Sequence, residues 1–353
     1  MDVQALLKQM VDKGVSDIFI IAGRPLSFKL GNRIQSLNDQ ILTPALTREC
    51  ILGIYALSGG RDADTLLARG DDDFSFSIPG VSRFRVNTYK QRGSLAAVIR
   101  VVAFHLPDPK ALHIPDSVLQ LADKRRGLLL FTGPSGSGKT TSLACLIDRI
   151  NATRNAHIIT LENPIEYLHS HRQSIISQRE ISIDTDGYAV ALRAALRQSP
   201  DVILIGELRD AETISITLTA AETGHLVIST LHTLGTANAI DRLVDAFPAS
   251  QQNLVRMQLS MVLQSVIFQQ LVPARDGGMQ SAFEIMHCNS AIRNLIRDGR
   301  THQIPTVIQS GGGEGMVSMD MSLLRLYREG VITAQEAVLH SLAPEAMARQ
   351  VGL

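Results

Sequence analysis

The residues with the clearest chemical meaning lie in one glycine-rich stretch, Gly133-Pro-Ser-Gly-Ser-Gly-Lys139-Thr140, which matches the pattern GxxxxGK[ST] in full. Glycines let the backbone curl so that successive N–H groups point inward at phosphate oxygens. An apolar run at 128–132 precedes the stretch, and a helix predicted over 139–150 turns its positive end toward the anion. The stretch therefore predicts a site for ATP with Mg²⁺, in which Lys139 reaches the β- and γ-phosphates and Thr140 ligates the metal. The residues assigned to nucleotide binding here are Gly133, Pro134, Ser135, Gly136, Ser137, Gly138, Lys139, Thr140 and Thr141.

Two further segments could bring carboxylates to this site. Asp201-Val-Ile-Leu-Ile-Gly206-Glu207 reads as a buried strand that ends in an acid. In P-loop enzymes a strand beside the phosphate loop delivers an acidic residue to the metal or to the attacking water. The alternative is a core strand followed by a surface glutamate, and the phosphate loop upstream favours the functional interpretation. Glu162 and Glu166 also follow a predicted strand, at 157–161, although taken alone that segment is an ordinary acidic turn.

Histidines and arginines form weaker candidates. His225 and His232 flank a predicted strand at 226–230, and a lone histidine is more often structural than catalytic. His169 and His171 are close enough to suggest a metal, but no matching ligands accompany them. Four arginines lie on or beside strands of the first hundred residues, and the sequence alone favours a solvated sheet edge for them: Arg83, Arg85, Arg92 and Arg100. Phosphoryl transfer nevertheless profits from a cation that a neighbouring subunit supplies.

Composition limits the class of protein. The chain has 353 residues, of which 45% are hydrophobic and 19% charged, as in soluble globular proteins. Lys plus Arg equals Asp plus Glu, so the broad basic surface of a nucleic-acid binder is not indicated. Three distant cysteines without a CxxC pair favour a reducing cytosol over a zinc ribbon or disulfide framework. The N-terminus lacks the apolar core of a signal peptide, and 257–274 is interpreted as a buried amphipathic helix.

The pattern along the chain changes once and predicts two domains. Residues 1–103 alternate as expected for an α+β domain with an antiparallel sheet, including a hairpin signal at Gly31-Asn32. A proline-containing stretch at 104–116 is interpreted as a linker. Residues 117–353 begin with alternating strands and helices, which predicts a doubly wound α/β domain, and beyond about residue 250 the chain is expected to be mostly helical.

Several motifs together resemble one family, the secretion ATPases, and within it the twitching-motility retraction ATPases of the PilT/PilU type. GPSGSGKTTS is similar to the family's Walker A segment, ITLENPIEY to its acidic box, RQSPDVILIGELRD to its Walker B segment and TAAETGHLVISTLHT to its histidine box. Residues 291–297, AIRNLIR, resemble a motif associated with pilus retraction. The resemblance covers nearly the whole chain. Residues 291–297 also read as an amphipathic helix that buries Ile292, Leu295 and Ile296. Such a helix could present Arg293 and Arg297 outward to a partner.

The resemblance implies a role for each matching residue. Glu207 would be the catalytic or water-orienting carboxylate, with Glu162 and Glu166 supporting Mg²⁺ or water. The further residues implied in nucleotide contact or sensing are Arg209, His225 and His232, and those implied to reach the γ-phosphate across a subunit boundary are Arg85 and Arg100, with Arg83 weaker. Two positions depart from the family pattern. Asn163 stands where the family usually has aspartate, and Ser16-Asp17-Ile18-Phe19 lacks the family's histidine.

The resemblance also implies an architecture and an activity. It predicts a PAS-like N-terminal domain followed by a RecA-like P-loop ATPase domain with a helical C-terminal tail. It further implies a cytoplasmic homohexamer that uses ATP and Mg²⁺ to retract a type IV pilus. The ring would act at the inner membrane through a platform protein, and a paralogous ATPase could share the work. The alternatives are a pilus-assembly or type II secretion ATPase, many of which carry a tetracysteine zinc site, a nucleic-acid translocase, and a nucleotide-binding regulator without turnover.

Overall fold

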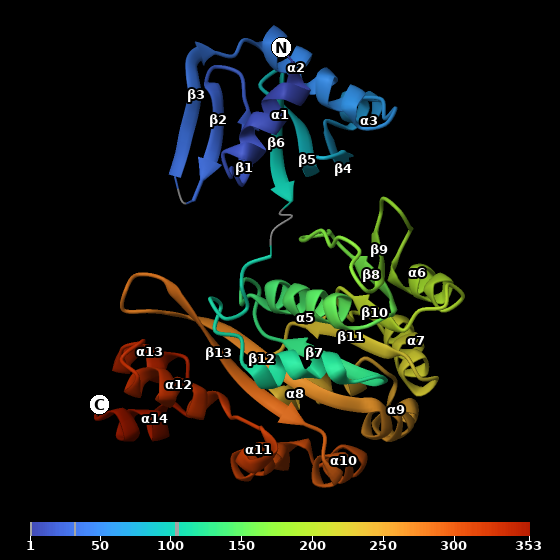
Figure 1. Ribbon diagram of the computed structural model, residues 1–353, viewed down its shortest axis with the longest axis vertical. Helices are drawn as coiled ribbons and strands as arrows, with labels where there is room; N and C mark the ends of the chain where they lie inside the picture. The colour runs from blue at the N-terminus through green and yellow to red at the C-terminus, as the bar shows by residue number, and fades with distance from the viewer. Residues whose placement is uncertain (1, 32, 103–105) are drawn as a thin grey trace. The chain divides into compact units, whose positions relative to one another are not determined.

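The structure is a computed structural model that describes residues 2–31, 33–102 and 106–353, and its chain divides into two compact units (Figure 1). The first unit is formed by the described residues up to 102 together with residues 166–168, and the second by residues 106–165 and 169–353. The domain boundaries expected from the sequence stay predictions. The first two residues of the proposed linker at 104–116, and Asn32 of the hairpin signal, lie outside the described residues.

The first unit is a six-stranded antiparallel sheet with helices packed on one face. Its strands lie in the order β3-β2-β1-β6-β5-β4. Their bounds are β1 Asp17–Ile20, β2 Pro25–Leu30, β3 Arg33–Ile41, β4 Asp71–Ile78, β5 Ser82–Gln91 and β6 Ser94–Val102, and the helices are α1 Val3–Asp12, α2 Pro44–Leu57 and α3 Asp64–Arg69. Residues of β5 alternate between buried and half-buried positions, so Phe84 and Val86 join the core while Arg83 and Arg85 face the other way. The predicted α+β class is confirmed, whereas the PAS-like character stays a prediction.

The second unit is built on a seven-stranded sheet in the order β13-β12-β7-β11-β10-β8-β9. All neighbouring strands are parallel except β12 and β13, which pair antiparallel. The strand bounds are β7 Gly127–Thr132, β8 His157–Glu162, β9 Ile175–Glu180, β10 Val202–Ile205, β11 Leu226–Leu231, β12 Leu263–Pro273 and β13 Met279–His287. The helix bounds are α4 Asp116–Leu119, α5 Lys139–Thr153, α6 Tyr188–Ala195, α7 Ala211–Glu222, α8 Thr236–Asp245, α9 Ala249–Val262, α10 Ser290–Arg297, α11 Ile304–Ser310, α12 Met319–Arg328, α13 Ala334–Leu339 and α14 Pro344–Val351.

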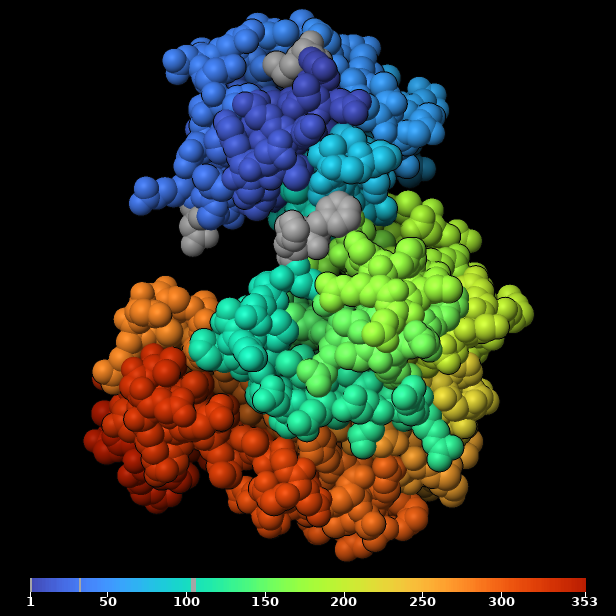
Figure 2. All heavy atoms as spheres, viewed as in Figure 1, coloured from blue at the N-terminus to red at the C-terminus, as the bar shows by residue number. Residues whose placement is uncertain are grey.

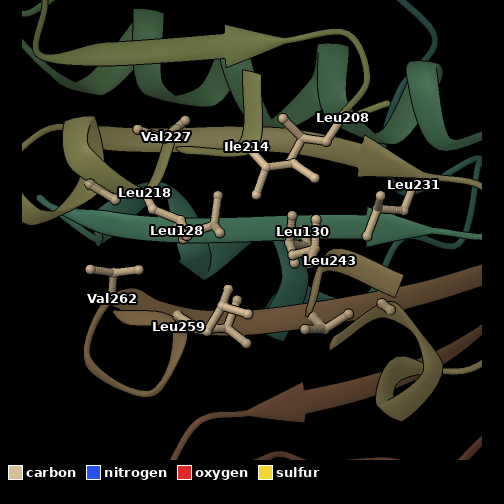
Figure 3. Packing of buried hydrophobic residues seen from close by; sticks show 14 of the residues in the cluster. Leu128, Leu130, Leu208, Ile214, Leu218, Val227, Leu231, Leu243, Leu259 and Val262 are labelled. Atoms are coloured by element: carbon tan, nitrogen blue, oxygen red, sulfur yellow. The ribbon is translucent and has the colours of Figure 1, made fainter. Parts of the chain in front are cut away.

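Hydrophobic residues cover both faces of the parallel sheet. Leu128 and Leu130 of β7 join the cluster beneath α6 to α11, which Figure 3 shows from close by. Leu129 and Phe131 of the same strand point the other way and pack beneath α4 and α5. Burial on both faces explains why these strands read as continuous apolar runs rather than as alternating patterns. The predicted α/β class with a doubly wound parallel sheet is confirmed.

The prediction for 257–274 and for the chain beyond residue 250 is wrong in part. Helix α9 ends at Val262, and residues 263–273 form β12, which runs between β7 and β13. Nearly all of β12 is buried, so its sequence carries no alternation to mark it as a strand. A short apolar run of this kind cannot be told from a buried helix by periodicity. The sequence interpretation also missed β9 and β13. Among the described residues, no helix has the length and apolar character needed to cross a membrane.

The C-terminal helices α12, α13 and α14 form a separate cluster against Phe268 and Val272 of β12. In the space-filling view they make a red lobe beside the orange β12–β13 hairpin (Figure 2). Glu284 of β13 connects this lobe to the sheet. Its buried carboxylate accepts hydrogen bonds from the backbone N–H of Thr236 (2.8 Å) and of Met319 (3.4 Å), the first residues of α8 and α12. One carboxylate thus caps two helices at their positive ends.

Replacing Glu284 by alanine is expected to destabilise the protein by about 3 kcal/mol, because two buried helix N-termini lose their acceptor. For a unit of this size, that loss lowers the melting temperature by roughly 6 to 12 °C. Differential scanning calorimetry measures the shift. The exposed Glu345 supplies the control, and Glu345→Ala should change the melting temperature little. Equal shifts in the two variants would contradict the capping role of Glu284.

His287, at the end of β13, makes stability depend on pH. Its Nδ1 lies 2.8 Å from the Ser265 hydroxyl, and burial lowers the pKa of the ring, with Lys124 acting in the same direction and Glu314 opposing it. The folded protein therefore binds fewer protons than the unfolded chain at pH values between the two pKa values. Stability from this group is complete above pH ~6.5 and is lost as the pH falls below it. The variant His287→Gln keeps a hydrogen-bonding group but does not titrate. When the pH is lowered from 7.5 to 5.5, we expect its melting temperature to fall by less than that of wild type. An identical loss in both proteins would exclude this role.

Candidate nucleotide-hydrolysing site

The candidate site forms where the parallel strands end. The glycine-rich loop follows β7, and the chain then enters α5 at Lys139. The neighbouring strands β11, β10 and β8 run parallel to β7, so His232, Glu207 and Glu162 stand at the same carboxyl edge. Ligands of open parallel sheets bind at this edge. The fold therefore brings together the glycine-rich loop, Glu207 at the end of β10 and Glu162 at the end of β8, as the sequence predicted.

The first position of the glycine loop, Gly133, leaves no room for a side chain. Gly133 adopts φ 144°, and a Cβ there would lie 2.2 Å from the carbonyl oxygen of Gln269 in β12. Thr132 fixes the entry to the loop, because its hydroxyl donates to the carbonyl of Thr233 at 2.6 Å. Ser137 is buried, and its Oγ has no hydrogen-bond partner within the described residues. A tight backbone cradle with an orphaned hydroxyl fits a ligand rich in acceptor oxygens, such as a phosphate chain.

Lys139 is folded into this cradle. Its ammonium donates to the carbonyl oxygens of Gly133 (2.8 Å) and Pro134 (2.9 Å), and only 7% of the residue is exposed. Burial lowers the pKa of the ammonium, and the negative charge of Glu207 opposes the shift. A desolvated cation held over the loop backbone is positioned to bind phosphate oxygens.

Glu207 is held in place by its neighbours. Arg209 lies 2.6 Å from one carboxylate oxygen, and the Nε2 of His232 lies 3.7 Å from the other. The backbone before the glutamate is fixed from β11, where the Thr230 hydroxyl donates to the carbonyl of Gly206 at 2.5 Å. The carboxylate side chain is only 13% exposed. Glu207 thus combines a fixed backbone with an ion pair, and its charge acts on Lys139.

The acidic box divides into a buried and an exposed part. Glu162 is buried at the end of β8, and its Oε1 accepts hydrogen bonds from the Thr160 hydroxyl (2.6 Å) and from the Gln178 amide (3.2 Å). Asn163 and Glu166 are exposed. The carboxylate of Glu162 and the exposed hydroxyl of Thr140, in the first turn of α5, are oxygen ligands of the kind that Mg²⁺ prefers. The residues at this edge therefore fit the metal.

The two histidines of the histidine box are not brought together. His232 follows β11 and lies beside Glu207. Burial, and then the charge of Lys139, lower the pKa of its ring. His225 precedes β11, and its carbonyl accepts from the N–H of Gly127, which begins β7. Its own ring bonds the carbonyl of Ala220 at 2.9 Å. The predicted contact of His225 with the nucleotide region is therefore not supported within this chain, because a six-residue strand separates the two edges.

Arg85 and Arg100 lie on the first unit, directly opposite one another on β5 and β6. Directly paired residues point to the same face of a sheet. Asp17 of β1 pairs with Arg100 in the ladder, and its carboxylate lies 3.0 Å from the guanidinium. The three residues line a cavity of about 280 Å³ together with Asp73, Asn87 and Val98. Arg83 also lies on β5, two residues before Arg85. The structure therefore places the two implied arginines side by side on one polar face.

Helix α10 contains the AIRNLIR segment, and of the three apolar residues expected to be buried, Ile292 and Ile296 are buried and Leu295 is half-buried. Its two arginines differ. Arg297 is exposed and donates to Asn294 on its own helix. Arg293 is half-buried, and its guanidinium donates to the carbonyl oxygens of Ser260 (2.6 Å) and Met261 (3.0 Å) near the end of α9. The expectation that Arg293 points outward is corrected, because capping the carbonyl end of α9 turns its guanidinium toward the protein.

Two residues near the site were missed by sequence reasoning. Gln269 lies beneath the glycine loop because β12 runs beside β7, and the misassigned strand concealed it. Tyr188 begins α6 directly after Gly187, and its hydroxyl lies close to Gly206. The sequence did contain one signal for Tyr188, because a tyrosine at the start of a helix precedes the strand that ends in an acidic residue. No group of three or more potential metal ligands among histidine, cysteine and acidic residues occurs in the part of the chain that the structure describes. His169 and His171 are not part of such a group.

Fold and site together define a P-loop nucleotide-hydrolysing domain of the RecA-like type: a glycine cradle with a buried lysine, flanked by carboxylates at neighbouring strand ends. The profile of the family described as "Type II/IV secretion system protein" matches residues 1–326. "Type IV pilus retractation ATPase PilT" of Pseudomonas aeruginosa is 42% identical over 345 residues, which are 98% of this chain and 99% of that protein. "Type IV pilus ATPase PilU" of the same organism is 39% identical and covers 97% of this chain and 89% of its own length.

A solved structure agrees with these sequence matches. The crystal structure of the pilus retraction motor PilT with bound ADP has a TM-score of 0.90 and 43% identity, and it covers 99% of both chains. The chain therefore belongs to the Type II/IV secretion system protein family. The resemblance inferred from the motifs is confirmed, and so is the RecA-like domain with a helical C-terminal region.

Proposed function

We propose that this protein is a homohexameric ATPase motor that uses ATP with Mg²⁺ to retract a type IV pilus. The observation that supports the proposal most directly is the combination of a complete P-loop site with a full-length likeness to PilT, named as a pilus retraction motor. The motor would work in the cytoplasm at the inner face of the membrane, reached through a platform protein. A PilU-like paralogue, named in one of the relatives, could share the task.

Each step of hydrolysis is assigned to a residue of this chain. The loop N–H groups and Lys139 bind the β- and γ-phosphates. Thr140 and Glu162 would hold Mg²⁺, which neutralises phosphate charge when it is bound. Glu207 accepts the proton of the attacking water, and its ion pair with Arg209 orients this carboxylate. Glu166 and His232 are given no step of their own, and His225 is given no role in hydrolysis.

Arg85 and Arg100 are proposed to reach the γ-phosphate of a neighbouring subunit. Mixed rings test this assignment. Rings of Lys139→Ala or of Arg100→Ala alone should be inactive, whereas mixing them lets an intact arginine face an intact P-loop in up to about a quarter of sites. Phosphate release from the mixture should therefore exceed that of either variant. A mixture no more active than its parents would show that Arg100 does not act across the boundary.

The motor function is tested in cells. A deletion strain should carry excess surface pili that do not retract, and it should not twitch. Complementation with wild type should restore motility, and complementation with Glu207→Gln should not. Loss of pili in the deletion strain would identify an assembly motor instead. ATPase activity that DNA stimulates, with a steep dependence on salt, would point to a nucleic-acid translocase.

A further inference from the structure

The hydroxyl of Tyr188 reaches the edge of the sheet where the carboxylates of Glu162 and Glu207 stand. A Cβ on Gly206 would lie 2.7 Å from this hydroxyl oxygen and 3.5 Å from the Cα of Glu162. Gly206 directly precedes Glu207, and its N–H donates to the carbonyl of Leu161 at 2.8 Å. The hydroxyl therefore occupies the space that a missing side chain leaves between the ends of β10 and β8.

The ring of Tyr188 is anchored. It is half-buried and packs against the hydrophobic cluster beneath α6 and α7. The charges that act on its hydroxyl are those of Glu207, Arg209 and Glu162. Burial and the two carboxylates raise the pKa of the hydroxyl far above the physiological range. The group therefore stays protonated, as a neutral hydrogen-bond donor among acceptors.

We propose that Tyr188 is a positioning residue for hydrolysis, whose hydroxyl orients the water that Glu207 activates. The inference rests on the proposed function, because it takes Glu207 as the group that acts on water. A water molecule offers two protons and two lone pairs. When one of its protons faces the Glu207 carboxylate and one lone pair accepts from Tyr188, the other lone pair is left to attack phosphorus. Fixing this orientation in advance lowers the barrier.

The variant that tests this role is Tyr188→Phe, which removes only the hydroxyl. We expect kcat for Mg·ATP hydrolysis to fall about tenfold, as for loss of a hydrogen bond to a reacting group. The KM for ATP should stay within about twofold, because the hydroxyl faces the carboxylates and not the phosphate loop. The ratio of wild-type to variant kcat should be constant from about pH 6 to 9, since a protonated hydroxyl does not titrate there.

A matched control is Tyr327→Phe. The Tyr327 hydroxyl donates to the carbonyl of Val351 at 3.2 Å, within the C-terminal lobe. Its loss should leave kcat unchanged and lower the melting temperature slightly.

The location of the Tyr188 hydroxyl is tested by coupling it to Gly206. In wild type, Gly206→Ala places a Cβ against this hydroxyl and should reduce activity. In the Tyr188→Phe background the closest contact is gone, and the next is the carbonyl of Leu161 at 3.3 Å. The alanine should therefore cost several-fold less there. Equal effects of Gly206→Ala in both backgrounds would place the hydroxyl elsewhere.

Three results would overturn the inference. They are a wild-type kcat in Tyr188→Phe, a fall in kcat accompanied by a fall in melting temperature, and a ratio of wild-type to variant kcat that changes with pH. Failure of the inference is distinguishable from failure of the proposed function. If Glu207→Gln stops turnover and Tyr188→Phe does not, only the role of Tyr188 is lost. If Glu207→Gln turns over normally, the assignment of Glu207 fails, and the role of Tyr188 fails with it.

Discussion

Lys139→Ala is expected to weaken ATP binding by roughly a hundredfold or more, because the variant loses a charge-assisted contact to the β- and γ-phosphates. The structure makes this loss hard to compensate. The ammonium is buried against the loop carbonyls of Gly133 and Pro134, and a neutral water molecule in its place would not replace its charge. Hydrolysis should be undetectable as a consequence. Titration with a fluorescent ATP analogue in the presence of Mg²⁺ measures the affinity.

The control for this variant is Lys124→Ala. Lys124 is an exposed lysine of the same unit, and the structure does not place it in the site. Its removal should leave affinity within about twofold, as is usual for exposed charges. Melting temperatures of both variants test whether the loop stays folded without the hydrogen bonds from Lys139. Folded Lys139→Ala protein with wild-type affinity would disprove the proposed cradle.

The sequence was sufficient for the parts of the site that are local in the chain. The phosphate loop, the strand before it and the helix after it form one continuous segment, so spacing alone located Lys139 and Thr140. Glu207 could be found because it ends an apolar run. Parallel strands in a sheet covered on both faces are apolar throughout, and this makes their ends easy to recognise.

The same reasoning failed where the sheet order decides the outcome. Gln269 lies under the glycine loop only because β12 inserts beside β7, more than a hundred residues after it. No periodicity in a fully buried strand reveals that neighbour. His225 was assigned to the site together with His232, although one precedes and the other follows the same strand. A strand of six residues is about 20 Å long, so that assignment could have been rejected from the sequence alone.

Side-chain direction was the other limit. Helical spacing predicted that Ile292 and Ile296 are buried, and they are. Spacing could not show that Arg293 turns back to cap α9, because the cap depends on how α9 and α10 pack. Tyr188 was overlooked for the same reason, since its distance from Gly206 depends on how α6 packs against β8, which pairs with β10.

Glu207→Gln is expected to separate binding from hydrolysis. Glutamine has the same shape, and its carbonyl oxygen can still accept from Arg209, so the strand end should keep its geometry. It cannot accept a proton, and kcat should therefore fall by about 10²- to 10⁴-fold. Affinity for ATP should be unchanged or higher, because a negative charge beside Lys139 and the phosphates is removed. Single-turnover phosphate release and nucleotide titration measure the two effects independently.

Parallel substitutions divide the work among the carboxylates. The exposed Glu212 pairs with Arg193 away from the site, and Glu212→Gln should keep wild-type turnover. Glu162→Gln should lower both turnover and the apparent affinity for Mg²⁺, because Glu162 is buried and is assigned to the metal. Glu166 is exposed and groups with the first unit, so its replacement should matter least of the three. If Glu162→Gln stopped turnover at saturating Mg²⁺ while Glu207→Gln did not, the two roles would be exchanged. The acid at the end of β8, rather than that at the end of β10, would then act on the water.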